Sequence, residues 1–90
     1  MSKYNFEVNV VKKSNLSHQD IILADALIEE WKNKTNMLQK NETTFFKEKT
    51  DNNDLALAGT FAHKLSLYPF LFESIQVKNY GENSRPTRYL

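Results

Sequence analysis

Cysteine is missing from this chain of 90 residues, and glycine and proline each occur only twice. Without cysteine there can be no disulfide framework and no thiolate metal site, which fits a reducing compartment or a secreted protein without disulfides, and of these we predict the cytoplasm. The two glycines, Gly59 and Gly81, stand alone, which excludes a glycine-rich phosphate loop. So little glycine also leaves little chain for a mobile catalytic lid.

Long apolar runs are lacking too. The longest, IILADALI at residues 21–28, has eight residues and contains Asp25, whereas a membrane-spanning helix needs about 20. The first residues, MSKYNFEVNV, have no apolar core of the kind found in signal peptides. We therefore expect a soluble protein that has no membrane partner.

Charge is almost balanced, with twelve basic and eleven acidic residues and a net charge of +1. This balance excludes a mimic of nucleic acid and gives no general attraction for polyanions, so nucleic-acid binding would need a local patch. Arginine is the scarce cation. Arg85 and Arg88 are the only two, and both lie in the final stretch SRPTRYL.

Catalytic and metal-binding patterns are not evident. The two histidines, His18 and His63, fall on different predicted helices, and a zinc site would need them to converge with a carboxylate. Glu29 and Glu30 are neighbours on a helix, so their side chains point about 100° apart and do not form a dyad. We expect no metal, no cofactor and no enzyme activity.

Three segments have the character of strands. In YNFEVNVVK, Tyr4, Phe6, Val8 and Val10 alternate with polar residues, which predicts a half-buried strand. NETTFFKEK, at residues 41–49, reads as a second strand with Phe45 and Phe46 on opposite faces. FLFESIQVKNYG, at residues 70–81, reads as a third.

A first helix is predicted to begin at His18. Ser17 fits an N-cap whose hydroxyl accepts from the amide of Asp20, and Leu16 and Ile21 have the spacing of a hydrophobic staple. An apolar stripe at 3–4 spacing then runs to Leu38. Ile22 and Leu23 widen the apolar arc almost around the helix, so this end is either deeply buried or part of a contact surface.

A second helix is predicted from Asp54 to Leu67, ended by Pro69. Gly59 inside it costs about 1 kcal/mol relative to alanine. Together with Ala58 and Ala62 it forms a patch of small residues, which favours close approach of another element such as the first helix.

The order of these segments is β-α-β-α-β. We predict a single α+β domain over residues 1–90, a small two-layer sandwich with a three-stranded sheet and two helices on one face. Residues 82–90 are either a mobile tail or a fourth, edge strand, because Pro86 cannot donate to a central ladder.

The leading functional hypothesis is a small regulator or inhibitor that binds a protein or nucleoprotein partner and blocks its working surface. Short, cysteine-free domains rich in lysine and asparagine are often encoded by phages and mobile elements. Arginine and tyrosine are enriched at interface hot spots. The predicted partner-binding residues are Arg85, Arg88, Tyr89, Tyr80, Ile22, Lys32 and Lys34.

Two alternatives stay open. One is a nucleic-acid-binding module in which aromatic residues of the strands (Phe45, Phe46, Tyr80) stack on bases beside a lysine patch. The patch would consist of Lys12, Lys13, Lys40, Lys47 and Lys49. The other is a homo-oligomer formed through Ile22 and Leu23 or through an unpaired strand edge.

Overall fold

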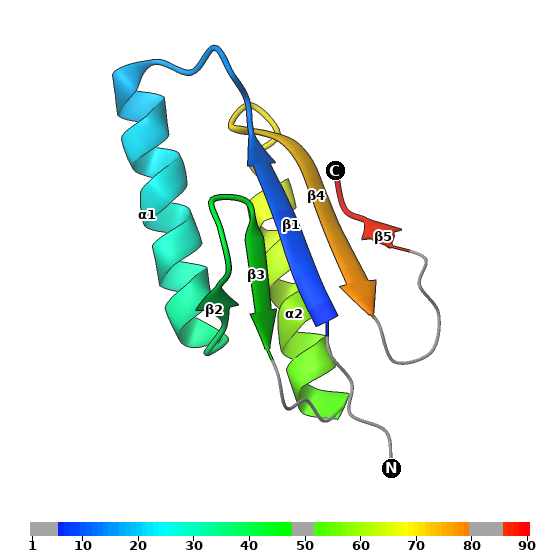
Figure 1. The fold of residues 1–90 in the computed structure, drawn as a ribbon. Helices are drawn as coiled ribbons and strands as arrows, with labels where there is room; N and C mark the ends of the chain where they lie inside the picture. Colours follow the sequence, from blue (N-terminus) through cyan, green and yellow to red (C-terminus); the bar gives the residue numbers. More distant parts are fainter. Residues whose placement is uncertain (1–5, 48–51, 80–85) are drawn as a thin grey trace.

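The computed structural model describes residues 6–47, 52–79 and 86–90, which form two helices and a five-stranded sheet (Figure 1). The elements follow one another in the order β1 (Phe6–Lys12), α1 (His18–Lys34), β2 (Leu38–Gln39), β3 (Thr44–Lys47), α2 (Asn52–Ser66), β4 (Phe72–Asn79) and β5 (Thr87–Arg88). Neither of these helices combines the length and the apolar character that a membrane span requires.

The strands lie in the order β2-β3-β1-β4-β5, and every neighbouring pair is antiparallel. The helix α1 connects β1 to β2 with β3 between them, and α2 connects β3 to β4 with β1 between them. This is the interleaved, split β-α-β connectivity of ferredoxin-like sandwiches. The α+β class is confirmed, but the predicted strand count is too low and the predicted element order β-α-β-α-β is wrong, because β2 was assigned to the end of the first helix and β5 was given only as an alternative to a tail.

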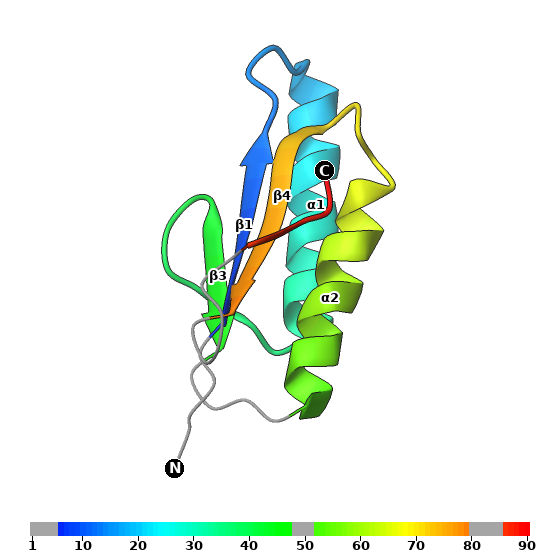
Figure 2. The same ribbon diagram turned by 90° about the vertical axis from the view of Figure 1, so that its right-hand side faces the viewer.

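Both helices cover the same face of the sheet (Figure 2). Alternation in β1 turns Phe6, Val8 and Val10 toward them, and all three side chains are buried as the pattern predicted. The Phe45 ring of β3 meets the Phe61 ring of α2 edge to face, with 5.7 Å between centroids. Among the described residues, no helix or strand covers the opposite face of the sheet, which is called the open face below.

The first helix begins where its capping signals predicted. The Ser17 hydroxyl oxygen accepts a hydrogen bond from the Asp20 amide at 3.2 Å, and α1 starts at His18. Its end differs from the prediction. Thr35 caps the helix with its hydroxyl donating to the Trp31 carbonyl oxygen at 2.7 Å, and Asn36 takes a left-handed φ of 56°. Leu38, predicted on the apolar stripe, therefore lies in β2 and is 55% exposed.

Candidate interaction surfaces

Exposed apolar side chains gather at one end of the molecule. Of the seven large apolar side chains that the described residues expose, three lie in the first two turns of α1 and two in the connection from α2 to β4. A hydrogen bond from the Lys13 amide to the Leu71 carbonyl oxygen, 3.0 Å long, joins that connection to the one preceding α1. The surface, called the apolar end below, consists of Ile21, Ile22, Leu23, Leu67 and Phe70.

The apolar end exists because α1 extends past the end of α2 (Figures 1 and 2). Ala24 and Ile28, further along α1, are buried, whereas Ile22 in the projecting turns is 56% exposed. The sequence left open whether this end of the helix is deeply buried or forms a contact surface. The exposure of Ile22 excludes deep burial. The ring of Phe70 packs beside the ring of Tyr68, with 6.3 Å between their centroids.

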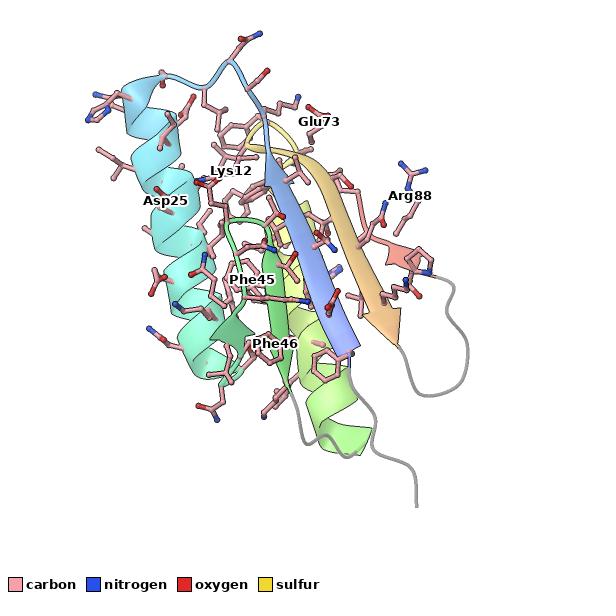
Figure 3. The ribbon with its side chains drawn as sticks, viewed as in Figure 1. Lys12, Asp25, Phe45, Phe46, Glu73 and Arg88 are labelled. Carbon is pink, nitrogen blue, oxygen red and sulfur yellow. The ribbon has the colours of Figure 1, made fainter. Side chains whose placement is uncertain are left out.

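The other predicted partner-binding residues lie elsewhere. Lys32 and Lys34 are at the opposite end of α1, where Lys32 Nζ pairs with Glu29 Oε2 at 2.9 Å and Lys34 Nζ lies 4.6 Å from the centre of the Trp31 ring. Arg88 is exposed in β5, on the edge of the sheet (Figure 3). Tyr89, next to it, packs against the hydrophobic core. The structure thus separates these residues, and Arg85 and Tyr80 lie outside the described residues.

The predicted lysine patch does not gather either. Lys12 at the end of β1 donates to Asp25 of α1 at 2.6 Å, as Figure 3 shows, and Lys13 follows it in the connection. Lys47 ends β3. Because β3 is antiparallel to β1, Lys47 lies beside the start of β1, at the opposite end of the strand from Lys12. Lys40 lies 3.6 Å from Glu7, and Lys49 is outside the described residues.

Only one of the two neighbouring phenylalanines is available on the open face. Phe45 is completely buried in the core, so it cannot stack on a base. Phe46 faces the other way, half-buried, as the register partner of Glu7 in β1 and of Leu38 in β2. The alternation predicted that these two rings would lie on opposite faces, but it did not tell which one enters the core.

Two rows of side chains cross the open face perpendicular to its strands. Each member of a row is the direct register partner of the next, so members lie side by side on one face of the sheet. The first row is Arg88, Gln76, Asn9 and Thr44, and the second is Lys78, Glu7, Phe46 and Leu38. No local pattern reveals these rows, because they depend on the register between distant segments.

A cleft of about 520 Å³ lies between α1 and the strands β1 to β3. Ile28 and Phe45 contribute its apolar walls, and its polar lining includes Asp25 and Glu29. Both carboxylates hold lysines, since Asp25 pairs with Lys12 and Glu29 with Lys32. In the parts of the chain that the structure describes, no three histidine, aspartate or glutamate side chains are grouped to hold a metal ion.

Comparison with protein-family models, with curated proteins and with solved structures finds no match to this chain. The functional argument therefore rests on the two surfaces just described, the apolar end and the open face.

Proposed function

We propose that this protein is a small, non-enzymatic regulator or inhibitor that binds a protein or nucleoprotein partner and sterically blocks its working surface. The observation that carries the proposal is the apolar end, which holds five of the seven large apolar side chains that the described residues expose. Exposed apolar patches mark interaction sites in soluble proteins. The composition supports a cytoplasmic protein encoded by a phage or mobile element, which is part of the same proposal.

The energetics favour binding at this end. Fully burying one leucine, isoleucine or phenylalanine side chain is worth about 1.5–3 kcal/mol, so covering five that are about half exposed offers several kcal/mol. The surface is also held in place before it binds. Ser17 caps the helix that carries Ile22, and Tyr68 packs beside Phe70, so little conformational entropy is lost on docking.

The shape suggests how a partner is engaged. The first turns of α1 project beyond α2 and present isoleucine and leucine side chains around the helix. A projecting apolar helix end fits a hydrophobic groove on another protein, as amphipathic helices do in many complexes. Occupying such a groove would exclude the partner's own ligand without any chemical step by this protein.

The test is a pull-down from the lysate of the source organism or its host, at about 150 mM salt, with and without nuclease treatment. The doubly substituted variant Ile22→Gln with Phe70→Ser should lose the captured protein by about tenfold or more, because polar groups replace two of the apolar anchors. The matched control is Leu38→Gln, since Leu38 is 55% exposed and Ile22 56% exposed, on different surfaces.

The proposal fails if the double variant captures its partner as well as the wild type does, or if Leu38→Gln loses it equally. Both variants should keep their melting temperature within a few degrees, because the altered side chains are largely in solvent. Capture that disappears with nuclease would favour the nucleic-acid alternative, and sedimentation as a dimer that Ile22→Gln abolishes would make a second copy the occupant.

A further inference from the structure

The first row of the open face is a line of polar groups with a cation at each end. Arg88, Gln76, Asn9 and Thr44 come from β5, β4, β1 and β3 in turn. Neighbouring strands are about 4.8 Å apart, so this line is about 14 Å long. Beyond Thr44, the Lys40 amide donates to the Thr44 carbonyl oxygen at 2.9 Å, which places a lysine at the end opposite Arg88.

The amides in the middle of this row have hydrogen-bonding capacity to spare. The Asn9 Oδ1 atom accepts from the Thr44 hydroxyl at 3.3 Å, so the amino group of Asn9 remains able to donate. The Gln76 side chain has no hydrogen-bond partner among the described residues. Asparagine and glutamine side chains can donate and accept together, and this pairing matches the edge of a nucleobase.

The second row provides an apolar platform next to these amides. Phe46 lies in it beside the exposed side chain of Leu38, two residues along β3 from Thr44. Two residues along a strand correspond to about 7 Å, so the ring is within reach of a group that contacts the amide row. An accessible aromatic ring on a sheet is the kind of surface on which bases stack.

The described residues of the two rows carry more positive than negative charge, although the whole chain is nearly neutral. With Lys40 at their end, these described residues include three cations, Lys40, Lys78 and Arg88, and one carboxylate, that of Glu7, which lies 3.6 Å from Lys40. A polyanion is favoured over a cationic ligand on such a face. An acidic peptide would satisfy the charges and could also pair with the amides, but it would offer the Phe46 ring a stacking partner only where it carried an aromatic residue, whereas every base has a stacking face.

We infer that the open face is a second binding site, separate from the apolar end, and that its ligand is single-stranded nucleic acid. Phe46 stacks on a base, Asn9 and Gln76 hydrogen-bond to base edges, and the cations contact phosphates. The apolar end and the open face share no residue, so this inference does not depend on the proposed function.

The experiment is fluorescence anisotropy of labelled single-stranded RNA and DNA of about 12 nucleotides and mixed sequence. Measurements are made at about 50 and 200 mM salt. Binding should weaken with salt, because each phosphate contact releases counterions and adds about −0.7 to the slope of log affinity against log salt. Binding of either RNA or DNA supports the inference, and their ratio reports whether the 2′-hydroxyl is read.

Two variants localise the site. Gln76→Ala with Arg88→Gln should lower the affinity by about tenfold, since it removes an amide and a guanidinium from one row. The control, Lys34→Gln, also removes one positive charge, but from α1 in the helical layer. It should keep the affinity within about twofold, because Lys34 pairs with Glu30 and lies over the Trp31 ring of its own helix and belongs to neither row of the open face.

The inference is overturned if neither oligonucleotide raises the anisotropy at low salt, or if Lys34→Gln loses as much affinity as the double variant. It is also overturned if Gln76→Ala with Arg88→Gln loses a protein partner in the pull-down while oligonucleotide binding is unchanged. The variant Ile22→Gln with Phe70→Ser should still bind the oligonucleotide. The pull-down and the anisotropy measurement can therefore reject the proposal for the apolar end and the inference for the open face independently.

Discussion

At the residue scale, Gly59 of α2 and Tyr89 explain how the last described residues are held. The Tyr89 amide donates to the Ile75 carbonyl oxygen at 2.8 Å, which brings the segment back along β4. A Cβ atom built on Gly59 would lie 3.1 Å from the Tyr89 hydroxyl oxygen, closer than an ordinary van der Waals contact. The glycine predicted to permit close approach does so, and the approaching group is a tyrosine.

This contact predicts a coupling between the two residues. Gly59→Ala gains about 1 kcal/mol of helix propensity, but it crowds the Tyr89 hydroxyl, so the two effects oppose each other. In the Tyr89→Phe background the hydroxyl is gone and only the gain remains. The propensity gain is the same in both backgrounds, so we expect the substitution to be more favourable in the Tyr89→Phe background by the crowding cost, about 0.5–3 kcal/mol, measured by chemical denaturation as a double-mutant cycle. Equal effects in both backgrounds would show that the contact is not tight.

At the element scale, the two ends of α1 differ in how far the sequence determines them. The start depends on local groups, the Ser17 hydroxyl and the Asp20 amide, and was predicted correctly. The end was not, because Thr35 and Leu38 continue the 3–4 spacing and neither glycine nor proline marks a stop. Asn36 makes the turn, since asparagine tolerates the left-handed region, and Leu38 then pairs with Phe46 of β3.

The start of α1 yields a stability prediction. Ser17→Ala removes the acceptor of the Asp20 amide and should lower the free energy of unfolding by about 1 kcal/mol. Ser14→Ala is the control, because Ser14 is exposed and its side chain has no hydrogen bond to the described residues. It should change the free energy by less than about 0.5 kcal/mol. Similar losses in the two variants, by urea denaturation, would argue against the cap.

At the scale of the whole molecule, the alternation of each strand told which side chains share a face but not which ones meet. Asn9 was predicted to face away from Val8 and Val10, and it does. That Asn9 lies between Gln76 and Thr44 depends on pairing between segments far apart in the chain. The exposure of Ile22 was also left open by the sequence, because it depends on where α2 ends relative to α1.

The small side chains buried between the packed elements give a further prediction. Ala24 of α1 and Ala58 and Ala62 of α2 are completely buried, and these small side chains allow the elements to pack closely. Ala62→Leu should force them apart and lower the free energy of unfolding by about 1–3 kcal/mol. Ala56→Leu, on the exposed side of the same helix, is the control and should cost little. Comparable melting temperatures for the two variants would contradict this account.

The two outermost strands, β2 and β5, have only two residues each. Each outer strand offers only two residues to a strand that approaches from another molecule, and at β5 the preceding residue is Pro86, which has no amide hydrogen to offer. Growth of the sheet from molecule to molecule, the first step toward fibrils, is thereby discouraged. The two short outer strands thus favour a protein that can leave a broad sheet face in water without polymerising.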